Sequence, residues 1–198
     1  MGGSTLSGDS TDLERRANSL ASSGRYAAAL HVQRRLVEAR EQSLGSEHPD
    51  TLAARGSLAS FTGEAGDAAG ARDQFAALLP IRQRVLGPEH PRTLTTRDDL
   101  AYYTGEAGDA AAARDQLAVL LPVRERVLGA EHPDVLTTRN NLAESTGKAG
   151  DAAGARDQFA ALLPIVERVL GPEHPRTLTT RINLAHWTEM ANRRNGVK

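Results

Sequence analysis

The sequence contains no cysteine, so disulfide bonds, thiolate metal sites and cysteine nucleophiles are all excluded. This absence fits a reducing compartment, and we expect the protein to be cytoplasmic. Aromatic residues make up only 4% of the chain, which suits close helix–helix contacts better than one thick globular core. Lysine occurs only at Lys148 and Lys198, so nearly every basic residue is arginine. Together with abundant alanine and glycine, this composition is typical of a GC-rich bacterial genome.

Long apolar runs and a strong net charge are missing as well. No stretch approaches the length of a membrane span, and the first 20 residues hold no apolar core of the signal-peptide type. The 24 basic and 25 acidic residues give a formal net charge of −1. Nothing therefore attracts the whole molecule to nucleic acid or to anionic lipid, and we expect neither as a partner.

A repeat of 42 residues is the strongest signal that is present. The three most similar units span residues 51–92, 93–134 and 135–176, a diverged unit spans 11–50, and a half unit spans 177–198. We expect residues 11–198 to form a single repeat solenoid. Residues 1–10 are expected to be a flexible tail or a cloning remnant.

The first half of each unit has the signals of a helix. In the unit 93–134 this helix is expected to start near Pro91, because proline suits a first helical position, and to run to about Thr104. The residue before a proline is pushed out of the α region, so His90 is placed to cap the helix. Gly105 and Gly108 are expected to end it.

The second half of the unit predicts another helix. Asp109 is a favourable N-cap, an alanine-rich run follows, and Gly129 is the expected stop. Apolar residues recur in steps of three and four on both helices. They are Leu94, Leu100, Ala101, Ala113, Leu117, Leu120, Val123 and Val127. One helix pair cannot bury such a face alone, so stacked pairs are expected to share a continuous core.

Prolines interrupt the second helices at Pro80, Pro122 and Pro164. An interior proline removes a hydrogen bond and costs roughly 3 kcal/mol unless the helix bends. We expect a kinked second helix in these units, with a break into two helices as the alternative.

The last full unit resembles a tetratricopeptide repeat. The residues that carry the resemblance are Leu142, Ala143, Gly150, Ala155, Phe159 and Leu162, and the phrases LGPEHP and NNLA resemble the kinesin-light-chain subclass. The resemblance covers the chain from about Thr11 to Thr188. It implies an all-α fold: a right-handed superhelical solenoid of about four antiparallel helix pairs plus a terminal helix. It also implies that the first helices line a concave peptide-binding groove, and it implies no enzymatic activity.

Differences among the units concentrate on one stripe of the first helices, at positions i, i+1, i+4, i+5 and i+8. At about 100° per residue these positions span roughly 140° of the helix, opposite Leu94, Leu100 and Ala101. We interpret the stripe as a recognition surface on a constant frame, with drift at exposed positions as the alternative. The predicted groove residues are Ser57, Ser60, Glu64, Asp98, Asp99, Tyr102, Glu106, Asn140, Asn141, Glu144, Lys148, Asn183, His186 and Trp187.

The chemistry of this stripe limits the ligand. Tyr102 and Trp187 are the candidate anchors because aromatic residues often dominate binding energy, although Trp187 has the alternative of packing as a terminal cap. Related repeats that hold a C-terminal carboxylate use lysine, arginine and asparagine in this groove. Here Asn141 and Asn183 match such positions, but the basic partners are replaced by acidic residues. We therefore expect a neutral or basic peptide, with the two asparagines bonding its backbone.

Four arginines stand where the family has a large apolar residue, at Arg55, Arg97, Arg139 and Arg181. They face the packed side and need partners there. Asp73, Asp115 and Asp157 on the second helices are the expected partners in an arginine–aspartate ladder. The alternative is that the arginine side chains extend to solvent.

No catalytic constellation emerges. The histidines His48, His90, His132 and His174 lie one repeat apart in separate loops, so helix capping is favoured over metal binding. Asp98 and Asp99 are adjacent on a helix and diverge. We expect no enzymatic activity, no metal and no cofactor.

The leading hypothesis is a non-catalytic scaffold that binds a protein or peptide. A sensor segment of a larger bacterial signalling ATPase is an alternative, because the sequence ends halfway through a unit, although no phosphate-binding loop is present. A second alternative is self-association, because near-identical repeats with an open apolar end can stack.

Overall fold

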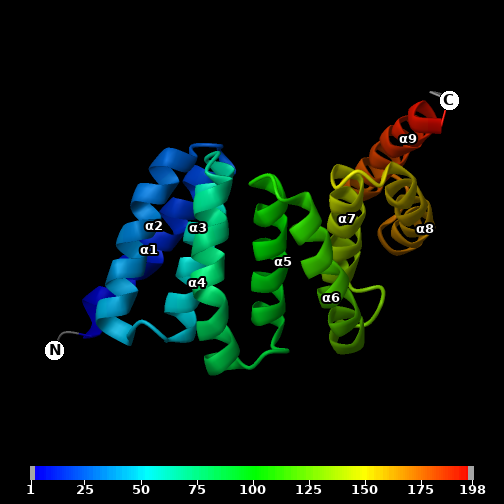
Figure 1. Ribbon diagram of the computed structural model, residues 1–198. Helices are drawn as coiled ribbons and strands as arrows, with labels where there is room; N and C mark the ends of the chain where they lie inside the picture. The colour runs from blue at the N-terminus through cyan, green and yellow to red at the C-terminus, as the bar shows by residue number, and fades with distance from the viewer. Residues whose placement is uncertain (1–2, 196–198) are drawn as a thin grey trace. The chain divides into compact units, whose positions relative to one another are not determined.

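The computed structural model describes the backbone of residues 3–195 and the side chains of residues 10–193. Within that range the chain is entirely helical (Figure 1). The helices are α1 (Gly3–Ser22), α2 (Tyr26–Leu44), α3 (Pro49–Glu64), α4 (Ala68–Leu86), α5 (Pro91–Glu106), α6 (Ala110–Leu128), α7 (Pro133–Lys148), α8 (Ala152–Leu170) and α9 (Pro175–Asn195). The predicted fold class, an all-α solenoid of consecutive helix pairs, is confirmed.

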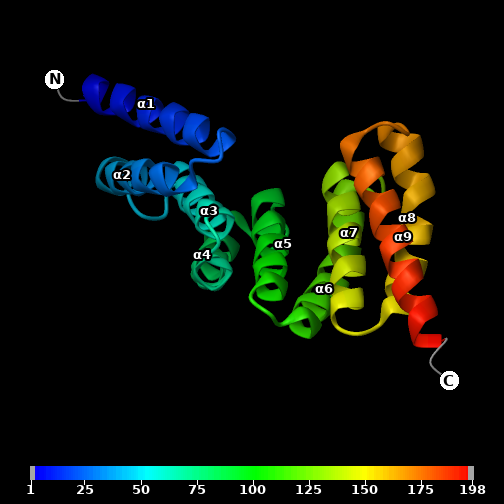
Figure 2. The same ribbon diagram turned by 90° about the horizontal axis from the view of Figure 1, so that it is seen from above.

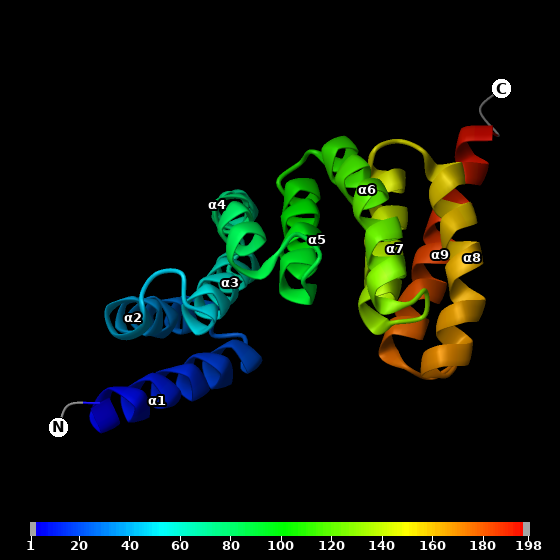
Figure 3. The ribbon, with the colours of Figure 1, turned by 90° about the horizontal axis from the view of Figure 1, so that it is seen from below.

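The chain divides into two compact parts, Met1–Tyr103 and Thr104–Lys198, which we call unit 1 and unit 2. From here on, the 42-residue units of the sequence are called repeats. In unit 1, α2 packs on α1 and α3, and α3 packs on α4 (Figure 2). In unit 2, α7 packs on α6 and α8, α8 packs on α9, and α7 also touches α9 (Figure 3). Each helix thus contacts mainly its neighbours along the chain, as in other repeat arrays.

The N-terminal helix starts earlier than the repeat does. α1 begins at Gly3, whereas the sequence places the start of the first repeat at Thr11. Of the predicted tail, Met1 and Gly2 lie outside the described residues, and Gly3 to Ser10 belong to α1, the first helix of the first repeat.

The first helices begin at the prolines and are capped by the preceding histidines, as predicted. In all four repeats the histidine Nδ1 accepts the backbone N–H of the residue after the proline, at 3.1–3.2 Å. These caps are His48, His90, His132 and His174. Each bond satisfies a helix-terminal N–H that has no partner within the helix. Among the described residues, no group of three or more histidines and carboxylates is placed to hold a metal ion.

The predicted ends of the second helix are confirmed. The Asp109 side chain accepts the N–H of Ala112 at 3.0 Å, and Gly129 caps the C-terminus of α6 with a φ of 92°. One predicted end of the first helix is wrong. Gly108 follows α5 with a φ of 104°, but Gly105 lies inside that helix, which continues to Glu106.

The second helices run through their prolines without a break. α6 continues from Ala110 to Leu128 across Pro122, and α4 and α8 do the same across Pro80 and Pro164. The alternative of two separate helices is therefore excluded. All three prolines are exposed, as is Ala118 four residues before Pro122, so water can reach the carbonyl that loses its partner. A bend at these prolines stays a prediction.

The core consists of small clusters rather than one thick centre. In unit 1, Leu52, Ala59, Phe75 and Leu78 form one cluster together with Tyr103. In unit 2 a second cluster gathers around Phe159, and its other large members are Leu136, Leu162, Val166 and Trp187. This pattern fits the scarcity of aromatic residues: a few rings each fill one contact between successive repeats.

Candidate binding surface of the first helices

The variable stripe divides into two sets of positions. The outer positions are at least partly exposed and hold most of the predicted groove residues: Ser57, Ser60, Glu64, Asp99, Tyr102, Glu106, Asn141, Glu144, Lys148, Asn183 and His186. The inner positions hold the buried residues Gly56, Asp98, Tyr103, Ser145 and Trp187. At the same positions of other repeats, Phe61 and Asn140 are half-buried and Ile182 is exposed. The expectation that variation avoids the packed face is therefore wrong, because successive first helices pack against one another along one edge of the stripe.

In unit 1 the inner ring of Tyr103 fills this helix–helix contact. It stacks on Phe75 of α4 with ring centroids 5.7 Å apart, and its hydroxyl donates to the Ser60 carbonyl at 3.3 Å. Gly63 makes room for the ring, since a Cβ atom there would lie 2.0 Å from it. The neighbouring Tyr102 is 41% exposed.

Trp187 occupies the same position in unit 2. The side chain is only 7% exposed, and a Cβ atom at Gly147 would lie 2.5 Å from its ring. It belongs to the cluster around Phe159, and its Nε1 donates to Glu144 at 3.5 Å. The alternative interpretation, a packed terminal residue, therefore describes Trp187, and the predicted ligand anchor is corrected.

The sequence does contain a signal for this packing. The residue that fills the contact is aromatic where the preceding second helix offers Phe75 or Phe159, whereas Ser145 follows Leu117. Among these three repeats the residue is aromatic where its neighbour on the second helix is aromatic, whereas Phe61 follows Gln33 in the repeat before them.

The outer positions of unit 1 are acidic and hydroxylic. Glu64 is exposed on α3, and Asp99 lies half-buried on α5. Ser57 and Ser60 line α3 beside them, and the Ser60 hydroxyl donates to the Gly56 carbonyl at 3.2 Å. Asp98, although predicted for the groove, is 5% exposed and faces the packing.

In unit 2 a lysine offsets the acidic outer positions. Lys148 Nζ lies 2.9 Å from Glu106 Oε1 and 3.6 Å from Glu144 Oε1. Partial burial lowers the pKa of Lys148, but hydrogen bonds and attraction from Glu106 and Glu144 outweigh it and raise the pKa above its ordinary value. Asn140, Asn141 and Asn183 are half-buried, and His186 is exposed.

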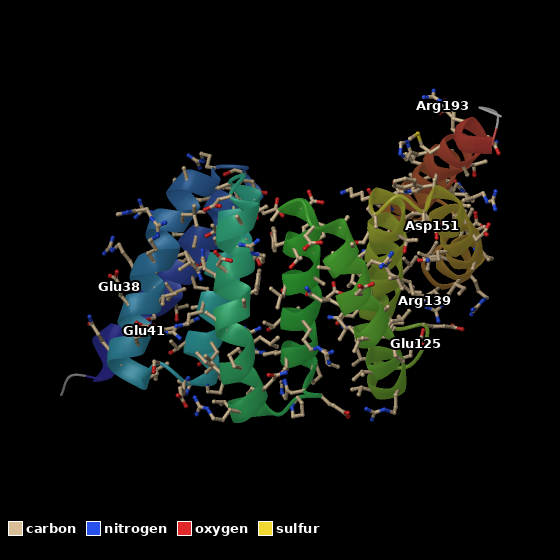
Figure 4. All side chains as sticks on the ribbon, viewed as in Figure 1. Glu38, Glu41, Glu125, Arg139, Asp151 and Arg193 are labelled. Atoms are coloured by element: carbon tan, nitrogen blue, oxygen red, sulfur yellow. The ribbon has the colours of Figure 1, made fainter. Side chains whose placement is uncertain are left out.

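The predicted arginine ladder exists with different partners. Arg55 pairs with Glu41 at 2.6 Å. Arg139 pairs with Glu125 at 2.8 Å, and both of these residues are labelled in Figure 4. Arg181 pairs in the same way with Glu167 at 2.7 Å. Each partner lies near the end of the preceding second helix. The expected partners Asp73, Asp115 and Asp157 instead bond the adjacent Arg72, Arg114 and Arg156.

Buried arginines on the second helices were missed by sequence reasoning. Arg82 is 6% exposed and Arg124 is 2% exposed. Arg124 Nη1 donates to the Asp134 carbonyl at 3.0 Å and to Thr138 Oγ1 at 2.7 Å. The last repeat has Val166 at this position, and that apolar replacement is the signal by which burial could have been predicted.

Cavities lie beside the helices of both units. One of about 140 Å³ lies among α7, α8 and α9 and is lined by Leu136, Asn140, Val166, Leu170, Arg176 and Thr180. Asn140 is the predicted groove residue that reaches it. Two larger cavities, of about 350 and 300 Å³, occupy equivalent places beside Arg55 in unit 1 and Arg139 in unit 2.

Comparison with known proteins agrees with this architecture. Models of the tetratricopeptide repeat match residues 13–50, 53–126 and 134–195, which is most of the chain. The chain belongs to the tetratricopeptide repeat family. Repeats of this family are typical scaffolds for protein–protein interaction. No match was found among curated proteins.

Solved tetratricopeptide repeat structures share the fold. Two structures of a Podosopora anserina protein, described as a kinesin light chain with nearly identical TPR-like repeats, align with TM-scores of 0.78 and 0.77. Both are 24% identical over 94% of this chain and 88% of that chain. BtubC (BKLC) from P. vanneervenii aligns with a TM-score of 0.75 at 19% identity, over 95% of this chain and 82% of its own. At these identities the likeness concerns the fold.

No helix among the described residues is both long enough and apolar enough to cross a membrane.

Proposed function

We propose that this tetratricopeptide repeat protein is a non-catalytic scaffold that binds a protein or peptide through the outer positions of its first helices. One observation carries the proposal. The second helices and loops of the last three repeats are nearly identical, whereas the outer positions differ from repeat to repeat and stay accessible. A constant frame with a variable accessible surface is what recognition of a particular ligand requires.

The charge of the outer positions favours a neutral or basic ligand. Glu64 and Asp99 give unit 1 an acidic surface, and in unit 2 the single Lys148 is shared by Glu106 and Glu144. An acidic tail would meet like charge on both surfaces. Tyr102 offers the exposed aromatic surface, and Asn141 and Asn183 offer amide groups to a peptide backbone.

A panel of labelled peptides of equal length, in acidic, neutral and basic series, tests the proposal by fluorescence anisotropy. Basic or neutral members are expected to bind, and the double variant Tyr102→Ala with Asn141→Ala is expected to weaken binding at least ten-fold. Arg156→Ala, on the exposed side of α8, serves as the control and should bind as the unaltered protein does. Preference for acidic peptides, or binding that the double variant leaves unchanged, would refute this surface.

Self-association is a second candidate because α9 exposes a row of apolar side chains. Leu178 is 40% exposed, Ile182 67% and Met190 39%, whereas Leu136, which corresponds to Leu178 in the previous repeat, is 3% exposed. Sedimentation velocity over a concentration series tests this candidate. Association that Ile182→Glu abolishes would support it, and a monomer at every concentration would exclude it.

A further inference from the structure

The cavity of about 140 Å³ in unit 2 has a counterpart in unit 1 that is filled. There the guanidinium of Arg82 lies between α3 and α5. Its Nη2 donates to the Leu52 carbonyl at 2.7 Å, and its Nη1 donates to Thr96 Oγ1 at 2.6 Å and to the Arg92 carbonyl at 3.2 Å. These backbone and hydroxyl acceptors form a receptor for a planar cation with several N–H groups.

Unit 2 keeps the three acceptor positions of this receptor. The residues two repeats further along the chain are Leu136, Arg176 and Thr180, identical in type to Leu52, Arg92 and Thr96. The hydroxyl geometry is also the same, since Thr180 Oγ1 donates to the Arg176 carbonyl at 2.8 Å, as Thr96 does to the Arg92 carbonyl at 2.8 Å. The remaining lone pairs of the Thr180 hydroxyl can therefore accept a bond.

What the repeat 135–176 lacks is the guanidinium, which Arg82 and Arg124 supply in the two repeats before it. Val166 stands where Arg82 stands in unit 1, and its short side chain leaves the cavity open. At about 140 Å³ the cavity exceeds the roughly 30 Å³ share of one water molecule several-fold. Its apolar lining of Leu136, Val166 and Leu170 suits the aliphatic stem of a long side chain.

We propose that this cavity binds the guanidinium of an arginine side chain from a bound peptide, in the place that Arg82 occupies in its own repeat. The proposal rests on the proposed scaffold function and deepens it by naming a ligand side chain. Asn140, which replaces Gly56, lies at the cavity and offers its amide oxygen as a further acceptor. An arginine here agrees with the neutral or basic ligand that the outer positions favour.

Hydrogen bonds, rather than an ion pair, provide the recognition. Burial lowers the pKa of Arg82, Arg92 lowers it further, and Asp99 partly compensates by raising it. In unit 2, Asn183 replaces Asp99, and Arg176 replaces Arg92. The cavity thus offers acceptors without that carboxylate, and a single arginine should bind weakly and add selectivity to a larger peptide contact.

The direct test titrates the full chain with Nα-acetylarginine N-methylamide at millimolar concentrations and follows the Val166 methyl and Thr180 amide signals by NMR. Saturable shifts are expected. The leucine and lysine derivatives should bind about ten-fold more weakly, because they cannot supply the planar set of donors. The citrulline derivative, which presents a carbonyl oxygen in place of one donor, should fall between them. Equal or tighter binding of the leucine or citrulline derivative would overturn the proposal.

Further variants test whether the Thr180 hydroxyl accepts a bond from the guanidinium and whether the ligand occupies the cavity beside Val166. Thr180→Val removes one acceptor at nearly constant volume and should weaken arginine binding several-fold without affecting the leucine derivative. Thr188→Val is the matched control, since its hydroxyl makes the same kind of bond to Leu184 and does not line the cavity. Val166→Arg with Asn140→Gly rebuilds the arrangement of unit 1 and should abolish arginine binding. Binding that persists in this variant would overturn the proposal.

The outcomes separate this proposal from the scaffold function. Peptides that bind through Tyr102 and Asn141 with no preference for arginine would exclude the guanidinium site and leave the scaffold function standing. Binding of the arginine derivative at Val166 with no binding of any peptide would exclude the scaffold function and leave only a cavity that binds a free guanidinium.

Discussion

Unit 1 and unit 2 share one contact between first helices and differ in what lies beside it. In both, an aromatic ring from one first helix covers a glycine of the previous first helix: Tyr103 covers Gly63, and Trp187 covers Gly147. Beside this shared contact, unit 1 buries the guanidinium of Arg82, whereas the last full repeat of unit 2 has Val166 and an open cavity. Unit 2 buries a guanidinium only in its first repeat, at Arg124. Two repeats of nearly the same sequence therefore enclose either the guanidinium of Arg82 or a cavity in its place.

The comparison also separates two causes of variation among repeats. At the inner positions, Tyr103 and Trp187 accompany Phe75 and Phe159, whereas the outer positions are at least partly exposed. Substitutions in the two units test this distinction.

The largest effect is expected for Trp187→Ala. Because the ring is buried in the core of unit 2, its removal should lower the free energy of unfolding by about 3–5 kcal/mol. Tyr102→Ala, at an exposed position, should cost about 1 kcal/mol. Urea denaturation followed by circular dichroism measures both. Similar small losses for the two variants would mean that Trp187 is a ligand anchor and not part of the frame.

Gly147→Ala should have the next largest effect. Its Cβ atom would lie 2.5 Å from the Trp187 ring, and a buried ring has little room to move, so a loss of about 1–3 kcal/mol is expected. Gly105→Ala is the matched control, because its nearest neighbour would be the Ala113 Cβ at 3.2 Å. That variant should be close to neutral, since alanine is the better helix former. Thermal unfolding of both proteins would reveal the contrast, and equal losses would contradict it.

Gln83→Glu should produce a smaller gain. Gln83 stands where three other repeats have the glutamate partner of the arginine ladder, so the substitution offers Arg97 the ion pair that Arg139 makes with Glu125. A partly exposed pair is worth about 0.5 kcal/mol and weakens with added salt. A double-mutant cycle with Arg97→Ala measures the coupling. A gain that persists without Arg97 would show that no ion pair forms.

The smallest effect concerns acid sensitivity. Glu47 in unit 1 and Glu131 in unit 2 accept hydrogen bonds from Arg84 and Arg168, which lower the pKa of both carboxyl groups below the ordinary value of 4.5. A lowered folded-state pKa adds stability above the unfolded pKa, and this stability is lost as pH falls through the folded value. Glu131→Gln should therefore slightly reduce the loss of stability between neutral pH and about pH 3. Both pairs are fully exposed, so a large change would point to another carboxylate.

Much of the local structure followed from short-range sequence signals. The His–Pro step predicted the start and the cap of α3, α5, α7 and α9, and Asp109 and Gly129 predicted the bounds of α6. These signals act within a few residues, so one sequence suffices to interpret them. Gly105 was misassigned as a helix end because a glycine inside a helix looks the same in sequence as a glycine at a helix terminus.

The candidate site was predictable only in part. The outer positions, such as Tyr102 and Lys148, followed from the helical period of the variable stripe. Trp187 and Asp98 did not, because the period tells which side of one helix a residue occupies and not which other helix covers that side. The ladder partner of Arg139 was missed for the same reason: Asp157 and Glu125 are both acidic residues on second helices, and only the packing brings Glu125 within reach.

The repeat, the helix pairs, their caps and the membership in the tetratricopeptide repeat family could all be inferred from the sequence, because each depends on patterns within one 42-residue repeat. Tertiary structure alone decided which variable residues are buried, which carboxylate pairs with each ladder arginine, and that Val166 leaves open the place that Arg82 fills. These features depend on contacts between successive repeats within unit 1 and within unit 2, where a side chain of one repeat meets a helix of the next.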